Sequence, residues 1–239
     1  MNVAMIFAGG TGQRMHMGTV PKQFLRLYGK PIIVYTLEIF EKNPDVDAIV
    51  VACLESWVDE MNRLVKEFDL KKVVSVVPGG STGQESIFNG LTEVRRLYGE
   101  DEVIVLIHDG VRPLVDSETV SSTVRCAREK GNGVTVTQAT ETVVQKEENE
   151  RVSKIMDRKT CFLARAPQTY HLKELYACHL KARAEGRNDF IDSASIMHYY
   201  GYDLYTVEGN AENIKITKAV DFYIFRAIMD ARDNSQVFG

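Results

Sequence analysis

Glycines and two cations near the start of the chain could together hold a polyphosphate. Three glycines fall within four positions of the stretch FAGGTGQRMHMGTVPKQF: Gly9, Gly10 and Gly12. Glycines let backbone N–H groups approach phosphate oxygens with no Cβ in the way. Arg14 and Lys22 follow, and their charges could neutralise such an anion. A tight turn with two solvated cations is the alternative, but this arrangement just after a first strand favours nucleotide phosphates.

Two well-known glycine signatures do not match this stretch. The Walker A pattern requires Gly-Lys followed by Ser or Thr, whereas Gly29-Lys30 is followed by Pro31. The Rossmann fingerprint requires a third glycine where Met15 stands. The second expected strand also ends without the acidic residue that binds a ribose, so a dinucleotide-dependent oxidoreductase is disfavoured.

Two further residues could act on phosphates. Asp109 ends the most apolar strand pattern, where a hard oxygen ligand could hold Mg²⁺. Its alternative role is a turn or helix N-cap, which Arg112-Pro113 directly after it makes less attractive. Lys215 lies just before a helix that opens near Thr217, and its ammonium could contact an α-phosphate. The alternative for Lys215 is an ordinary surface lysine.

The blocks AGGTGQRM and PKQF resemble the signature of nucleotidyltransferases that make nucleoside-diphosphate sugars and alditols. Within that group the chain most resembles the cytidylyltransferases that act on 2-C-methylerythritol 4-phosphate and on ribitol 5-phosphate. Six further blocks match in order and spacing along almost the whole chain: GG…ESIFNGL (79–91), HDGVRPLV (108–115), DR (157–158), APQTY (166–170), DSASIM (192–197) and NIKIT (213–217).

The resemblance implies that CMP passes from CTP to a polyol phosphate, with release of pyrophosphate and with Mg²⁺ as cofactor. The nucleotide-binding residues it implies are Ala8, Gly9, Gly10, Gly12, Gly79, Gly80 and Ser86. The catalytic residues it implies are Arg14, Lys22 and Lys215. Acceptor binding is assigned to Arg112, Arg158 and Asp192, and metal binding to Asp109. Ser86, placed beside the base by the resemblance, could equally be a simple residue of a helix N-terminus.

Three positions depart from the pattern of the resembled enzymes. Gly83 stands where an arginine is usual, and Ala166 and Ile191 stand where threonines are usual. Gln84 or Arg165 could compensate for the lost cation. The departures leave the phosphate-contacting residues intact, so cytidylyl transfer is expected, whereas the acceptor stays open. Ribitol 5-phosphate or a similar alditol phosphate, for a cell-surface polymer, is favoured over methylerythritol 4-phosphate. A catalytically silent nucleotide-binding module is the alternative from another class, and the retained cations argue against it.

The elements that must position these residues alternate between strand and helix. Strand patterns cover 2–8, 46–53, 73–77, 103–109, 133–137 and 202–208. Helical patterns follow at about 33–40, 58–68, 87–97, 116–130, 171–185, 190–199 and 218–231. This order predicts one α/β domain over residues 1–239, with a doubly wound, mostly parallel sheet. The resemblance implies that this sheet is of the Rossmann-like nucleotidyltransferase type. Ligands are then expected at the carboxyl ends of its strands.

One segment, about residues 141–157, breaks the alternation. Two short alternating arms flank the polar turn KEENE, which predicts a protruding β-hairpin. Such a hairpin buries little by itself, so it should pack on a partner subunit or over the active site, unless it is simply solvated. By resemblance, Arg158 would reach the acceptor phosphate from a dimer-exchanged arm, which implies a homodimer.

Composition excludes several partners. The formal net charge of −4 disfavours a general nucleic-acid binder. No apolar run approaches the roughly 20 residues that span a bilayer, and the N-terminus does not resemble a signal peptide. The four cysteines are far apart and form no metal-binding or redox pair. We therefore expect a cytoplasmic protein with no membrane partner.

Overall fold

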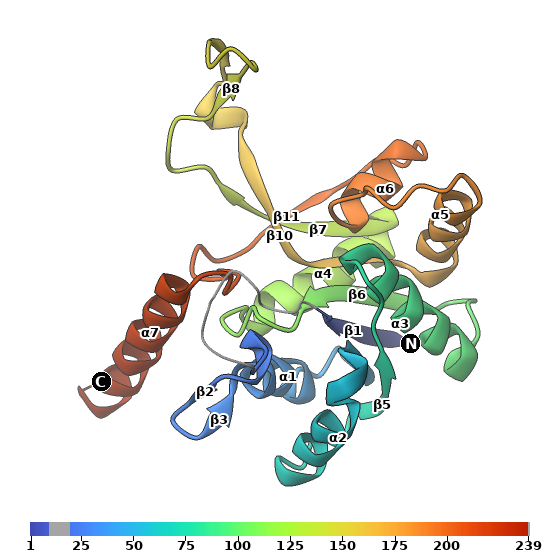
Figure 1. Ribbon diagram of the computed structural model, residues 1–239, viewed down its shortest axis with the longest axis vertical. Helices are drawn as coiled ribbons and strands as arrows, with labels where there is room; N and C mark the ends of the chain where they lie inside the picture. Colours follow the sequence, from blue (N-terminus) through green and yellow to red (C-terminus); the bar gives the residue numbers. More distant parts are fainter. Residues whose placement is uncertain (10–19, 239) are drawn as a thin grey trace.

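The computed structural model describes residues 1–9 and 20–238. Across these residues a seven-stranded sheet runs through the middle of the molecule, with helices on both faces (Figure 1). The strands lie in the order β11-β7-β10-β6-β1-β4-β5. Their bounds are β1 Asn2–Ala8, β4 Ala48–Cys53, β5 Val73–Pro78, β6 Ile104–Asp109, β7 Asn132–Gln138, β10 Phe162–His171 and β11 Thr206–Glu208.

The sheet is mostly parallel, as the sequence predicts. β1 pairs in parallel with β4 and β6, β4 with β5, and β7 with β11. β10 lies antiparallel between β6 and β7 and is the one reversed strand of this described sheet. The sequence patterns did not predict β10, because Pro167 falls inside it and is unusual within a sheet. The strand accommodates the proline where its register on β7 shifts between Ala164 and Gln168.

Helices cover the sheet in two layers. Their bounds are α1 Ile32–Lys42, α2 Val58–Glu67, α3 Gly83–Tyr98, α4 Ser117–Lys130, α5 Leu172–Ala184, α6 Ser193–Tyr199 and α7 Ala219–Phe238. The core on one face joins strand residues to α3, α5 and α6, and the core on the other face joins them to α1, α2 and α4. A smaller core packs α7 through Phe225 against Ile32 and Leu114. This two-sided cover confirms the predicted doubly wound architecture.

Local signals fix the ends of several helices. Asp116 caps α4 by accepting a hydrogen bond from the Thr119 N–H at 2.6 Å, and Gly131 ends that helix with φ of 95°. α6 begins only at Ser193, three residues later than the helical pattern suggested, because the Asp192 side chain caps it. β11 is likewise shorter than predicted. None of the helices in the described residues is long and apolar enough to cross a membrane.

The predicted hairpin projects away from the sheet (Figure 1). Its strands are β8 Val144–Lys146 and β9 Val152–Ile155, and they pair antiparallel with Val144 opposite Ile155. All seven of these residues are exposed, and Ile155 reaches 68%. A short 3-10 turn, η4 Arg158–Thr160, joins the arm to β10. A second pair of short strands, β2 Arg26–Leu27 and β3 Lys30–Pro31, follows the 3-10 turn η2 Lys22–Phe24.

Candidate active site

Two adjoining cavities open at the carboxyl ends of β1 and β6. The glycine-side cavity has a volume of about 320 Å³, and its lining includes Ala8, Gly9, Lys22, Ser81, Thr82 and Ser86. The β10-side cavity has a volume of about 260 Å³, and its lining includes Ile107, Arg112, Arg165, Gln168 and Asp192. Four residues line both cavities: Phe7, Gly83, Asp109 and Lys215. Ligand sites at strand carboxyl ends are the rule in open α/β sheets, and the two cavities lie at that end of the sheet.

An ion-pair cluster forms the shared wall. Asp109 Oδ1 lies 2.5 Å from Lys215 Nζ, and Asp109 Oδ2 accepts a hydrogen bond from Arg112 Nε at 2.8 Å. Arg112 Nη1 also donates to the Asn213 carbonyl at 2.9 Å. Asn213 in turn donates from Nδ2 to the Ala166 carbonyl at 2.6 Å. The segment before α7 is thereby fastened to β6 and β10, which brings Lys215 to the site from a distant part of the chain.

Neighbouring charges, rather than burial, determine the protonation state of the Asp109 carboxyl. Burial alone would raise its pKa, but the Lys215 and Arg112 charges and their hydrogen bonds outweigh burial and lower the pKa to about 2. Its neighbour His108 is fully buried, and burial lowers the pKa of that imidazole to about 4. The shared wall therefore presents an ionised carboxylate and two cations at neutral pH.

The predicted phosphate loop reaches the glycine-side cavity at both of its described ends. Ala8 and Gly9 leave β1 into this cavity, and Lys22 enters it from η2. A Cβ on Gly9 would stand 2.5 Å from Ser86 Oγ, so this close approach requires glycine. Gly10, Gly12 and Arg14 lie outside the described residues, and their predicted roles stay predictions. Sequence reasoning missed Gln23, whose buried Nε2 donates to the Ala8 carbonyl at 2.6 Å and ties the two ends together.

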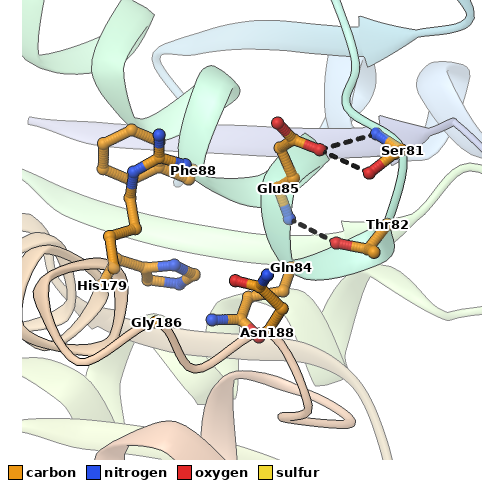
Figure 2. Close-up of a pocket in the computed structure, with 9 residues that line it drawn as sticks. Ser81, Thr82, Gln84, Glu85, Phe88, His179, Gly186 and Asn188 are labelled. Carbon is orange, nitrogen blue, oxygen red and sulfur yellow. Dashed lines mark hydrogen bonds between the residues drawn. The ribbon is translucent and has the colours of Figure 1, made fainter.

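The loop over residues 79–86 is held by its own polar groups. Thr82 Oγ1 caps α3 by accepting from the Glu85 N–H, and Glu85 Oε2 accepts from the Ser81 N–H and hydroxyl (Figure 2). Ser86 is buried, and its hydroxyl accepts from the Gly80 N–H at 3.0 Å and donates to the Thr82 carbonyl at 2.9 Å.

The predicted nucleotide-binding residues of this loop thus divide into two groups. Ser86 lines the glycine-side cavity while it also ties the loop together. Gly79 and Gly80 are not among the residues that line the two cavities. The Gly79 N–H donates to the Cys53 carbonyl at 2.6 Å, and a Cβ on Gly79 would stand 2.9 Å from Ser86 Oγ. Both glycines therefore shape the turn, whereas Ser81, Thr82 and Gly83 present the loop to the cavity.

Behind this loop lies a third cavity of about 380 Å³, between α3 and α5 (Figure 2). The guanidinium of Arg183 lies over the Phe88 ring, 4.4 Å from its centroid. The buried His179 ring borders the same cavity, and its Nε2 has no hydrogen-bond partner among the described residues. Burial, followed by the Arg183 charge, lowers the pKa of His179 to about 4.

Arg112 and Asp192, both predicted to bind the acceptor, line the β10-side cavity. Asp192 Oδ1 accepts from the Ser195 N–H at 2.8 Å, and its Oδ2 accepts from Gln168 Nε2 at 2.9 Å. Arg165 reaches the same cavity from β10. The three positions that depart from the resembled pattern, Gly83, Ala166 and Ile191, all line this cavity, and Gly83 also lines the other one.

Arg158 lies elsewhere in the chain. It begins η4 at the base of the hairpin arm, is exposed, and donates from Nη1 to the Thr140 carbonyl at 3.3 Å. It lines neither cavity of its own chain. This position is compatible with the predicted role in a partner subunit, and that role stays a prediction.

The donor set at the shared wall fits a metal ion that arrives with phosphates. The described residues contain no group of three or more His, Cys, Asp or Glu side chains that could hold a metal. Asp109 is a single hard oxygen donor that borders both cavities. Mg²⁺ is commonly held by one or two carboxylates together with substrate phosphates, so Asp109 fits that kind of site. An ion there would share the carboxylate with Lys215 and Arg112.

Comparisons with known proteins converge on one family. The family model described as "IspD: 2-C-methyl-D-erythritol 4-phosphate cytidylyltransferase" matches residues 2–231. Over the full length of both chains, the sequence is 48% identical to the ribitol-5-phosphate cytidylyltransferase of Vibrio parahaemolyticus. It is 32% identical to the 2-C-methyl-D-erythritol 4-phosphate cytidylyltransferase of Clostridium botulinum, over 96% of this chain and 97% of that one.

A solved structure supports the fold independently. The 4-diphosphocytidyl-2C-methyl-D-erythritol synthase from Anaerococcus prevotii superposes with a TM-score of 0.82, covering 96% of each chain at 23% identity. At that identity the similarity concerns the fold alone, and it confirms the α/β architecture predicted from the sequence.

Proposed function

The chain belongs to the IspD family of cytidylyltransferases and is therefore a nucleotidyltransferase, and from this premise we propose that it transfers CMP from CTP to ribitol 5-phosphate. The resemblance inferred from the sequence is confirmed at the level of the family. The observation that carries the choice of acceptor is the 48% identity to a ribitol-5-phosphate enzyme, against 32% to a methylerythritol-phosphate enzyme. Pyrophosphate and CDP-ribitol would be the products.

In the proposed reaction an oxygen of the acceptor phosphate forms a bond to the α-phosphorus of CTP. The bond from that phosphorus to its bridging oxygen breaks, and pyrophosphate leaves. The nucleophile needs little proton removal, because a phosphate monoester is largely dianionic near neutral pH. Catalysis then depends on positioning and on positive charge around the phosphates, which is what the cations of the two cavities can supply.

The glycine-side cavity is the proposed site of CTP. Lys22 would neutralise the triphosphate, and the backbone at Gly9 could approach it closely because no Cβ intervenes. The base would lie against the loop of residues 79–86, whose internal hydrogen bonds hold it in place before CTP binds. Arg14, which the sequence assigns to the same phosphates, completes the proposed set.

The β10-side cavity is the proposed site of the acceptor. Its phosphate would meet the α-phosphorus at the shared wall, where the Lys215 ammonium can offset charge as the new bond forms. Arg112 is held rigidly by Asp109 and Asn213, so it would contribute fixed positive potential. Asp192 could accept hydrogen bonds from the polyol hydroxyls.

We also propose Mg²⁺ as the cofactor, held by Asp109 together with the CTP phosphates. When bound, the ion would offset negative charge on the triphosphate. EDTA should therefore abolish turnover and added Mg²⁺ restore it, while the melting temperature of the protein without CTP stays unchanged. A fall in melting temperature with EDTA would instead indicate a structural metal.

The acceptor assignment is tested by pyrophosphate release from CTP with a panel of acceptors. The panel contains ribitol 5-phosphate, methylerythritol 4-phosphate, glycerol 3-phosphate and related alditol phosphates. We expect the highest kcat/KM for ribitol 5-phosphate, and little release when UTP, ATP or GTP replaces CTP. A clear preference for methylerythritol 4-phosphate would contradict the acceptor and leave the reaction class intact.

A homodimer formed through the hairpin arm is a further part of the proposal. β8 and β9 expose Val144, Val152 and Ile155, and an isolated two-stranded hairpin is at best marginally stable in water. A second copy of the chain could cover these side chains. It would also bring Arg158, at the base of the arm, toward the β10-side cavity of the other copy.

Complementation tests the arm directly. Co-expressed Lys22→Ala and Arg158→Ala chains would form one complete site per heterodimer if Arg158 acts in the partner's cavity. We expect each single variant to be impaired and the mixture to regain activity. A mixture no more active than the sum of its parts would contradict exchange of the arm.

We further propose a cytoplasmic setting, where CTP is available, and a product destined for a cell-surface polymer.

A further inference from the structure

We propose that Arg165 binds the phosphate of the acceptor from within its own chain, as a specificity-determining residue of the β10-side cavity. This inference rests on the proposed function, since it takes a phosphorylated polyol as the occupant of that cavity. The sequence names Arg165 only as one of two residues that could compensate for a lost cation, with no assigned ligand. The proposal follows from the geometry and charge of the cavity.

The Arg165 side chain is anchored at one point and open at the other. β10 carries it into the cavity, where it is half-buried, and its Nε donates to Thr137 Oγ1 on β7 at 3.2 Å. Its two terminal nitrogens make no hydrogen bond or ion pair within the described part of the chain. The planar fork of a guanidinium can bind two phosphate oxygens at once, so these nitrogens are suited to an anion.

The other charged groups of the cavity are already engaged. Lys215 and Arg112 both contact Asp109. The two oxygens of Asp192 accept hydrogen bonds from the Ser195 N–H and from Gln168 Nε2. The cavity thus contains three cations and two carboxylates, and Arg165 is the cation that lacks a carboxylate partner in the described residues.

The position of this charge has an energetic consequence. Burial, followed by the nearby charge of Arg112, lowers the pKa of Arg165, which means that both features disfavour its cation in the free protein. An anion bound between Arg165 and the shared wall would relieve that cost. The acceptor phosphate is the anion that must come there, because its oxygen has to reach the α-phosphorus beside Asp109 and Lys215.

The test compares kinetic constants of Arg165→Ala with those of the wild-type enzyme. The KM for ribitol 5-phosphate should rise about 10- to 100-fold, the usual effect of losing a charged hydrogen bond, whereas the KM for CTP should change less than about twofold. Inorganic phosphate should inhibit the wild type competitively with the acceptor, and its inhibition constant should rise in parallel. Arg165→Lys should recover part of the loss, since it restores charge without the fork.

A matched control separates local from general effects of lost charge. Arg125→Ala removes an exposed arginine of α4 that lines neither cavity, and it should leave every constant unchanged. If Arg165→Ala lowers the melting temperature, Arg165→Met keeps most of the buried stem and answers the same question. The proposal is wrong if the acceptor KM and the phosphate inhibition constant both stay within twofold of wild type in a folded variant.

The outcome also remains separable from the proposed function. Should the wild type prefer methylerythritol 4-phosphate, the ribitol assignment fails, but the Arg165 variants must still raise the KM for that acceptor, which also carries a phosphate. An increase confined to Arg158→Ala, with Arg165→Ala unaffected, would assign the phosphate to the partner's arm and overturn the proposal.

Discussion

The glycine-side and β10-side cavities are lined by different kinds of residue. The glycine-side cavity uses the end of β1, the short turn at Lys22 and a loop closed by its own hydrogen bonds, so half of its lining residues are small: Ala8, Gly9, Ser81, Thr82, Gly83 and Ser86. The β10-side cavity uses side chains from β10 and from the segment before α6, namely Arg165, Gln168, Ile191 and Asp192. The two share the ion-pair cluster of Asp109 and Lys215.

This difference separates two kinds of specificity. A cavity lined by glycines and by a loop that its own hydrogen bonds hold depends on the fold, so single side-chain substitutions change its ligand less easily. A side-chain-lined cavity can change its ligand by single substitutions, with no change in the sheet. All three positions that depart from the resembled pattern line the β10-side cavity, and one of them, Ile191, is 94% exposed at its rim. Acceptor choice is thus the more adjustable property.

Lys22→Ala should have the largest effect of the substitutions that test this difference, and it should act through the glycine-side cavity. Loss of a cation beside the triphosphate should lower kcat by about 1,000-fold, while the KM for the acceptor changes little. Far-UV circular dichroism and the melting temperature should match wild type, because Lys22 lies in a short surface turn. Turnover at near wild-type rate would contradict the assignment of this cavity to CTP.

Lys215→Ala should affect both sides, because its ammonium lies in the shared wall. We expect kcat to fall about 100-fold and the apparent affinities for CTP and for the acceptor to weaken together. Lys218→Ala is the matched control, since that lysine is exposed three residues further on and lines neither cavity. A defect limited to one substrate would place Lys215 in one cavity rather than between the two.

The same division explains how much the sequence could predict. Glycines, cations and strand ends carry strong local patterns, so β1 and β6 were predicted correctly, and Lys22 and Asp109, which were predicted to share a phosphate site, line the same cavity. The sequence also paired the first strands with their helices, because buried parallel strands form continuous apolar runs. Most of the glycine-side cavity could therefore be predicted from the sequence.

The β10-side cavity was less readable, because it depends on a strand without a clear pattern. Pro167 and the register shift between Ala164 and Gln168 obscure β10, so no local pattern shows that Arg165 lines the same cavity as Asp109. Asn213 was also missed, although its side chain fastens the Lys215 segment to β10. Such contacts join residues about 50 positions apart, and periodicity reports only on neighbours within one element.

Thr137→Val tests the β10-side cavity and should have a smaller effect. Valine keeps the shape of threonine but removes the hydroxyl that accepts from Arg165 Nε. The guanidinium would lose its anchor, so the KM for the acceptor should rise about three- to tenfold, with kcat and the KM for CTP near wild type. Thr123→Val, at a buried hydroxyl of α4 that bonds the Val120 carbonyl, serves as the control. Equal effects of both variants on the acceptor KM would mean that the hydroxyl of Thr137 has no specific role.

The smallest expected effect concerns pH and the helices that support the glycine-side loop. His179 on α5 packs beside Phe88 of α3, the helix that begins in this loop, and Arg183 is the charged group whose field acts on it. Since its folded pKa is about 4 and an unfolded histidine titrates near 6.5, the unfolded chain binds more protons between those values. Stability should therefore fall as pH drops from about 6.5 toward 4, by at most about 1.4 kcal/mol per pH unit for one histidine.

The pKa of buried His108 is lowered in the same direction, so both histidines contribute to this loss of stability. His179→Gln should therefore remove about half of the fall attributable to the two histidines. Urea unfolding at pH 7 and pH 5 measures this change, with the exposed His198→Gln as control. If His179→Gln unfolds with the same pH dependence as the wild type, the buried imidazole behind the glycine-side loop does not contribute to the loss of stability in acid.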